Sequence, residues 1–332
     1  MAEPHDDILA PETTEDGETD HDSFVGEDPE SSTYSLSSSI YNYRQENGRT
    51  YHKYQDGKYS LPNDELEQER LDLQHHLFLL TFDNKLGLAP PNDPNSKVNR
   101  VLDLGTGTGI WAMDYADEHP EADVMGVDLS PIQPAFVPPN VRFQVDDVEQ
   151  DWTFDHHFDY IHSRLMTSSI PSWCDYLKQI YNNLTPGGYV ELQEADLFAK
   201  SDDDTLTKDR ALSKWLQHLD DASIKLGRPY QDISKLKGLM ADIGFVGIVQ
   251  TYKRWPMNTW PRDKIYKILG AWNLENMDSG LEAFSMAPLT RGLGWSKDEV
   301  TASLAIVRKE LNDKSIHAYW PVYSIYARKP EN

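Results

Sequence analysis

The chain has 332 residues, of which 39% are hydrophobic, and a formal net charge of −24. Residues 1–40 hold twelve Asp or Glu and no Lys or Arg, and the rest of the chain shows no basic stripe; direct nucleic-acid binding is therefore disfavoured, because neutralised phosphates supply most of its non-specific affinity. No apolar run reaches the roughly 18 residues that a membrane span needs, and Cys174, the only cysteine, has no partner for a disulfide or a cysteine-based zinc site.

Residues 1–40 are rich in Asp, Glu, Ser, Thr and Pro and have almost no periodic apolar pattern, which predicts a disordered acidic tail. A solubilising tail and a regulatory or partner-docking tail with phosphorylatable serines both fit this composition. The N-terminus lacks the basic and then apolar stretch of a signal peptide. We therefore expect an intracellular protein, in the cytoplasm, the nucleus or both.

Residues 41–95 form the next module, an aromatic segment followed by a helix and a Pro-rich end. Asn63 or Asp64 can cap the start of this helix, and the acidic residues that follow favour its positive end. Arg70 on the helix either pairs with a carboxylate of a lid or cofactor or forms a solvated helix salt bridge.

From residue 96 to about 330, apolar runs alternate with helix-like stretches, as in an α/β domain. The expected strands are Arg100–Leu104, Asp123–Asp128, Val141–Val145, Phe158–His162, Gly188–Gln193, Phe245–Tyr252 and Trp320–Arg328. This order predicts a doubly wound, mostly parallel sheet with right-handed crossovers. A helical insert is expected at about 257–316, and the strand after it is expected at the edge of the sheet.

A glycine-rich turn follows the first of these strands. The strand ends at Leu104, the chain turns through Gly105, Thr106, Gly107, Thr108 and Gly109, and a helix begins at Ile110. Backbone N–H groups at such a turn bind anionic or polar ligand groups. A dinucleotide fingerprint would place glycine where Ile110 stands, so NAD is the weaker interpretation.

Three carboxylates accompany this turn. Asp103, just before it, would repel a pyrophosphate but attract a cationic amino group, such as that of S-adenosylmethionine (SAM). Asp128, followed by Leu129, ends the second strand, where a carboxylate can accept hydrogen bonds from ribose hydroxyls. Asp147 and Val148 follow the third strand and suit an adenine contact by one carboxylate and one backbone N–H. Together these residues predict a SAM site.

Several longer phrases resemble the fungal LaeA-like class I SAM-dependent methyltransferases. They are KYSLPNDELEQERLDLQHHLFLL, RVLDLGTGTGIWA, GVDLSPIQPAFVPPNVRFQVDDVEQDW, FDYIHSR and NLTPGGYVELQE, and the resemblance spans residues 51–328. The fold that it implies is a Rossmann-like, mostly parallel sheet with an antiparallel last strand, covered by an N-terminal helical lid. It also implies SAM contacts by Asp103, Gly105, Gly107, Asp128 and Asp147, with Ser163 and Arg164 near the end of the fourth strand.

The sequence does not single out a catalytic residue. His75, His76, His162 and Glu194 are weak candidates for a site-lining or proton-transferring role, and each fits a packing role as well. Methyl transfer needs a general base only when the nucleophile arrives protonated. Trp255, Trp260, Tyr266 and Trp272 could wall an apolar acceptor pocket or pack the insert.

Three functions remain open. Members of the LaeA-like family look either like regulators of secondary metabolism that associate with velvet-type proteins in the nucleus or like tailoring enzymes. The methyl acceptor is therefore a protein or a small metabolite, the latter methylated on oxygen or nitrogen. The third possibility is a SAM-binding scaffold without turnover. The acidic tail slightly favours regulation, whereas the lack of a basic nuclear-targeting run speaks against it.

Overall fold

Seven apolar runs form one sheet in the computed structural model, which describes residues 41–331 except residue 56. β3 (Arg100–Leu104), β4 (Asp123–Asp128) and β5 (Val141–Val145) have the predicted limits. The other strands, each longer than predicted by some residues, are β6 (Phe158–Arg164), β7 (Leu184–Ala195), β8 (Val246–Pro256) and β9 (Tyr319–Arg328). The tail predicted for residues 1–40 lies outside the described residues.

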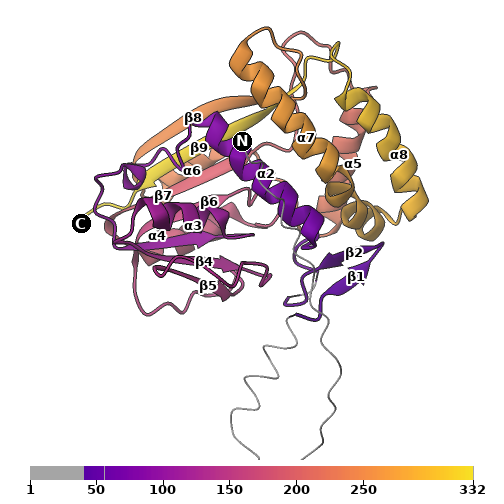
Figure 1. Cartoon of the computed structure of the whole chain (residues 1–332). Helices are drawn as coiled ribbons and strands as arrows, with labels where there is room; N and C mark the ends of the chain where they lie inside the picture. The colour runs from indigo at the N-terminus through magenta and orange to yellow at the C-terminus, as the bar shows by residue number, and fades with distance from the viewer. Residues whose placement is uncertain (1–40, 56, 332) are drawn as a thin grey trace, which may run out of the picture. The chain divides into compact units, whose positions relative to one another are not determined.

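The strand order is β5-β4-β3-β6-β7-β9-β8, and β9 is antiparallel to both of its neighbours, as expected for this fold class. The expectation that β9 lies at the edge is wrong, because it lies between β7 and β8 (Figure 1). The reason is visible in burial: nearly every residue of β9 is buried, whereas β8 exposes Val246 and Val249 at 39% and 41%. Position after a long insert does not determine position in the sheet.

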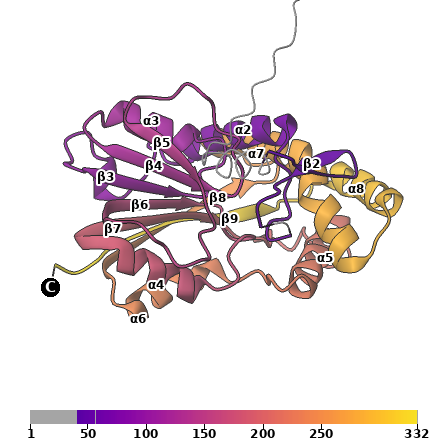
Figure 2. The ribbon, with the colours of Figure 1, turned by 90° about the horizontal axis from the view of Figure 1, so that it is seen from below.

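Helices cover both faces of the sheet (Figure 2). α3 (Ile110–Glu118) packs on one face through a cluster that contains Trp111 and Tyr115. α4 (Trp173–Asn183) and α6 (Leu236–Ile243) pack on the other face. This double cover explains why the central strands are almost continuously apolar.

A second layer of helices lies beyond the carboxyl ends of the strands (Figures 1 and 2). It consists of α2 (Glu65–Thr81), α5 (Ala211–Lys225), α7 (Lys264–Ala287), the π-helical turn η3 (Pro288–Gly292) and α8 (Lys297–Leu311). α7, η3 and α8 come from the chain between β8 and β9, and they share an apolar core with α2 and α5. Asp64 is the N-cap of α2, where its side chain accepts from the Glu67 N–H.

A short hairpin precedes α2 and was not predicted. β1 (Arg44–Glu46) and β2 (Arg49–Tyr51) pair antiparallel around Asn47-Gly48, whose φ values are 54° and 91°. An Asn-Gly dipeptide is the signal that could have revealed it. The remaining short elements are the 3₁₀ turns η1 (Pro90–Asn92) and η2 (Ile233–Lys235). Within the described residues no helix combines the length and apolar character needed to cross a membrane.

Candidate active site

A cavity of about 320 Å³ lies between the carboxyl ends of the strands and the second layer of helices. Its first half is lined by the glycine turn, by the loops after β4, β5 and β6, and by residues 57–63, which we call the closing segment. Its second half is lined by α5, α7, the inner face of α2 and two tryptophans of β8 and β9. One continuous space therefore joins the predicted SAM residues to a helical wall.

The glycine turn adopts backbone conformations that favour glycine. Gly105, Gly107 and Gly109 have φ values of 70°, 56° and 81°. A Cβ atom at Gly109 would come within 2.4 Å of Cζ of Phe143, so the turn packs directly on that ring. At Gly107 the nearest atom to such a Cβ would be Leu71 Cδ1 at 3.5 Å, and Gly107 lines the cavity. The turn thus presents bare backbone to the cavity.

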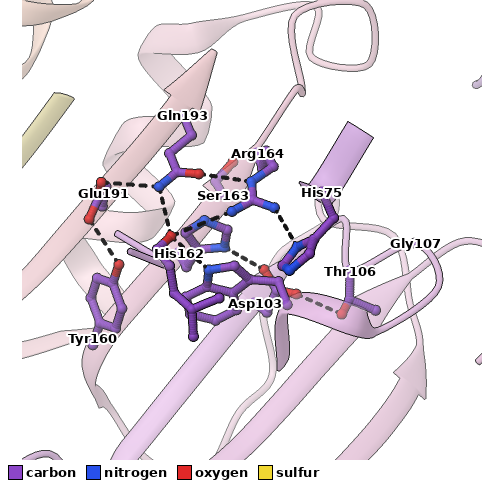
Figure 3. A network of polar contacts seen from close by, with 12 residues as sticks. His75, Asp103, Thr106, Gly107, Tyr160, His162, Ser163, Arg164, Glu191 and Gln193 are labelled. Carbon is purple, nitrogen blue, oxygen red and sulfur yellow. Dashed lines mark hydrogen bonds and ion pairs between the residues drawn. The ribbon is translucent and has the colours of Figure 1, made fainter. Parts of the chain in front are cut away.

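Asp103 binds both the glycine turn and the neighbouring strand β6 (Figure 3). Its side chain is buried; one oxygen accepts from Thr106 Oγ1 at 2.6 Å and the other bonds His162 Nδ1 at 2.7 Å. Asp103 and Thr106 both line the cavity. The predicted carboxylate is therefore in place, and it also fixes the turn to the adjacent strand β6.

His162 is completely buried and stacks on Trp111, with ring centroids 3.7 Å apart and planes 5° apart. Its Nδ1 carries the proton that binds Asp103, since a carboxylate can only accept. Its Nε2 has no hydrogen-bond partner within the described part of the chain. Burial lowers the pKa of His162, so the ring is neutral and supports the turn.

Asp128 ends β4 and lines the cavity together with Leu129. Its two oxygens accept from the N–H groups of Gly107 and Ser130, both at 2.9 Å. Burial raises the pKa of this carboxyl group. Asp128 therefore couples the glycine turn to the loop after β4 at the place where a ribose was predicted.

Asp147 and Val148 line the same half after β5. The Asp147 side chain is 2% exposed and forms an ion pair with Lys58 of the closing segment. Nζ of Lys58 also lies 3.5 Å from Glu149 Oε2. Asn63 Nδ2, at the other end of the closing segment, donates to Ser130 Oγ at 3.3 Å. The closing segment is thus held to two loops that carry predicted SAM residues.

Arg164 lies on the cavity wall between α2 and β7 (Figure 3). Its Nε donates to Gln193 Oε1 at 2.8 Å, and its Nη1 donates to His75 Nδ1 at 3.0 Å. His75 Nε2 must then carry the proton that it shares with Asp114 Oδ2, at 3.0 Å. Burial lowers the pKa of Arg164 to about 10 and lowers the pKa of His75. Arg164 remains cationic near pH 7, and both nitrogens of His75 are occupied.

Three predicted candidates do not line the cavity. His76 is exposed and packs on Trp272, with ring centroids 4.5 Å apart. The Ser163 side chain lies on the opposite face of β6, where its hydroxyl bonds Tyr176 Oη at 2.9 Å. Side chains alternate along a strand, so Ser163 cannot share the face of its neighbours.

Glu194 is the third of these candidates. It is completely buried, accepts from the N–H groups of Met166 and Thr167 at 2.9 and 3.1 Å, and accepts from Thr167 Oγ1 at 2.5 Å. Burial raises its pKa to about 7. Met166 and Thr167 do line the cavity, so Glu194 positions this loop.

One of the four aromatic residues named as a possible pocket wall lines the cavity. Trp255 lines the cavity, whereas Trp260 and Tyr266 line a separate, smaller pocket. Trp215 on α5 and Trp320 on β9 complete the wall and were not predicted. Their sequence signal was weak, because a tryptophan on an apolar face or strand indicates burial and not the cavity that it borders.

Arg70 also lines the cavity, and it forms a helix salt bridge that is buried instead of solvated. It forms a buried ion pair with Glu67, with Nη2 and Oε1 2.7 Å apart, and its Nη1 donates to Asn276 Oδ1 at 2.8 Å. The pair is an ordinary i,i+3 helix pair in spacing, but both side chains are only 2% exposed.

Glu191 is a supporting residue that the sequence did not indicate (Figure 3). It is completely buried in β7 and accepts from the N–H groups of Leu88 and Ala89, and from the hydroxyl groups of Tyr160 and Ser324. The chain that follows α2 is therefore anchored to the middle of the sheet. A charged residue in a buried strand was the available signal.

The chain is similar in sequence to known methyltransferases and regulators. A family described as "Methyltransferase domain" matches residues 73–250. "Methyltransferase pytC" of Aspergillus terreus is 42% identical over 304 residues, which cover 91% of this chain and 93% of that protein. "Secondary metabolism regulator LAE1" of Cochliobolus heterostrophus is 41% identical over 291 residues, covering 86% of this chain and 94% of that protein. "Secondary metabolism regulator laeA" of Aspergillus fumigatus is 37% identical over 303 residues, which cover 90% of this chain and 80% of that protein.

The fold, the glycine turn and these relatives define a class I, SAM-dependent methyltransferase. Within that class, the chain belongs to the fungal LaeA-like family. Its reaction therefore requires SAM and a methyl acceptor.

Proposed function

We propose that this protein binds SAM in the first half of the cavity and methylates an acceptor held in the second half. The observation that carries this proposal is the continuity of the cavity, which connects the glycine turn with the wall formed by α5 and α7. Bound SAM supplies a methyl group on a cationic sulfur, which an acceptor lone pair attacks in line as the carbon–sulfur bond breaks.

The first half fits SAM in its polarity and its shape. The bare backbone at Gly107 leaves room that a side chain would fill. In our assignment Asp128 accepts from the ribose hydroxyls, and Asp147 with the Val148 N–H holds the adenine edge. Arg164 directs N–H groups to the methionine carboxylate, and Asp103 with Thr106 holds the turn on the amino side. The Ser163 side chain takes no part, since it points away from the cavity.

Neither His75 nor His162 serves as a general base in this proposal. Both ring nitrogens of His75 are engaged by Arg164 and Asp114. The free nitrogen of His162 is fully buried. The chain would accelerate the reaction by aligning the acceptor with the methyl group and by excluding water under the closing segment.

For the biological role, we propose methylation that serves fungal secondary metabolism, inside the cell. The names of two relatives, which are regulators of secondary metabolism, support this assignment. In a regulatory version of the role, the chain works in the nucleus with velvet-type proteins. The second candidate is a tailoring O- or N-methyltransferase of a small metabolite, which the apolar wall of the cavity favours.

The test follows labelled methyl groups. The full chain is incubated with methyl-labelled SAM and, in parallel, with a fungal metabolite extract, a protein extract and histones, and with the Asp128→Ala variant as control. Label that moves into either fraction only with the unaltered protein supports the proposal, and the labelled fraction separates the two candidate roles. Tight binding of SAM without transfer to any fraction would leave a cofactor-binding scaffold and overturn the proposal.

A further inference from the structure

Three tryptophans in the second half of the cavity have no free polar atom, because each indole N–H already has a partner. The indole N–H groups of Trp215, Trp255 and Trp320 donate to Ser285 Oγ, Thr81 Oγ1 and the Leu197 carbonyl at 2.8, 2.7 and 3.1 Å. These three tryptophans are 2%, 3% and 5% exposed. They therefore offer ring surface to a ligand and no hydrogen bonds.

Two asparagines of α7 interrupt this wall. Asn273 and Asn276 are 1% and 2% exposed, both line the cavity, and they lie one helical turn apart. Residues with this spacing have their Cβ atoms about 5–6 Å apart. A buried amide that lacks partners costs free energy, so the hydrogen bonds of this pair show what remains available to a ligand.

The surrounding network fixes which atom of each amide is free. Asn276 Oδ1 accepts from Arg70 Nη1 at 2.8 Å and from Gln74 Nε2 at 3.4 Å, and a guanidinium can only donate. Its Nδ2 therefore remains, and no described residue accepts from it. Asn273 Nδ2 donates to the Pro256 carbonyl at 3.0 Å, which leaves Oδ1 without a partner among the described residues.

Neither free atom belongs to the fully buried polar atoms that lack partners in the described part of the chain. Each keeps some accessible surface, although its residue is almost completely buried, and both residues border the cavity. On α7, the wall thus offers one acceptor at Asn273 and one donor at Asn276.

We propose that the methyl acceptor is a small, mostly apolar aromatic molecule with a neighbouring hydrogen-bond donor and acceptor, as in a lactam, recognised by Asn273 and Asn276. The inference rests on the proposed function, whose acceptor it specifies.

The experiment compares two probes with the same bicyclic ring, of which the second is larger by one methyl group. 2-Quinolone carries an N–H donor beside a carbonyl acceptor, and N-methyl-2-quinolone keeps the carbonyl but lacks the donor. Their affinities for the full chain are measured by ligand-observed NMR at saturating S-adenosylhomocysteine. We expect 2-quinolone to bind about tenfold more tightly, which corresponds to one net hydrogen bond. In the Asn273→Leu variant, the ratio of the two affinities is expected to fall to about one.

Asn258→Leu is the matched control, because Asn258 is equally buried but donates to the Leu311 carbonyl at 2.9 Å and does not line the cavity. It is expected to keep the preference. Equal affinities of the unaltered protein for both probes, or binding of a histone-tail peptide but of neither quinolone, would overturn the inference without any variant. Failure of S-adenosylhomocysteine to bind would instead contradict the proposed function.

Discussion

Several carboxylate side chains in this site bind backbone N–H groups and so fix the positions of loops. Asp128 accepts from two N–H groups, and Asp103 joins the glycine turn to His162. Glu194, a catalytic candidate in the sequence, holds the loop at Met166. Carboxylates that hold loops and carboxylates that contact ligands look alike in a sequence, because both lie near the carboxyl ends of strands. Only the partners of each oxygen distinguish them.

Asp128→Ala is expected to weaken binding of S-adenosylhomocysteine at least about tenfold, because the turn loses its bond at Gly107 N–H as well as the proposed ribose contact. Isothermal titration calorimetry measures the change. Asp159→Ala is the control, since Asp159 accepts from the N–H groups of Asn99 and Arg100 at the opposite end of the strands. Equal losses in both variants would contradict a specific role for Asp128.

His162 predicts a dependence of stability on pH. Burial lowers its pKa in the folded chain below the ordinary value of 6.5, so below pH 6.5 the unfolded chain binds a proton that the folded chain refuses. The free energy of unfolding must then decrease as the pH is lowered below 6.5, by at most about 1.4 kcal/mol per pH unit for this proton.

His162→Asn tests this attribution by urea unfolding between pH 7 and pH 5. The Asn amide can replace the Nδ1 donor to Asp103 but does not titrate. The variant should be less stable at pH 7, because the stacking on Trp111 is lost, and its decline toward pH 5 should be shallower. A parallel decline in both proteins would assign the pH dependence to other groups, such as His75, whose pKa is also lowered.

At the scale of elements, sequence patterns predicted what is local. The limits of β3, β4 and β5 and the start of α3 followed from apolar runs and glycines. The position of β9 inside the sheet could not follow from such patterns, because strand order depends on pairing between distant segments. The polar contacts of α2 with α7 have the same origin: Arg70 and Asn276 are 206 positions apart in the chain.

The buried pair Glu67–Arg70 should make α2 sensitive to single substitutions. Arg70→Met leaves the Glu67 carboxylate buried without its cation, which is expected to cost about 3–5 kcal/mol. The double variant Glu67→Met/Arg70→Met should recover most of that loss, since no charge is then buried alone. Urea unfolding of both variants checks the prediction. A double variant as unstable as the single one would show that the contact with Asn276 dominates.

At the scale of the whole molecule, the cavity requires three parts of the chain. The sheet supplies the glycine turn and the loops, the helices between β8 and β9 supply much of the wall, and the closing segment lines the first half. The sequence indicated the first part by motif. The ion pair of Lys58 with Asp147 had no local signal, because the residues are 89 positions apart.

This ion pair should control the exchange of cofactor. Lys58→Met removes the cation that holds the closing segment to Asp147 and Glu149, so entry and exit should both become easier. We expect the association and dissociation rates of S-adenosylhomocysteine to rise several-fold in stopped-flow fluorescence, with a smaller change in their ratio.

Raising the salt concentration should speed exchange in the unaltered protein and have less effect in the variant, since salt screens a partly exposed pair. Lys53→Met, an exposed lysine just before the closing segment, is the control and should leave both rates unchanged. Identical rates in all three proteins would show that the closing segment opens without breaking this pair.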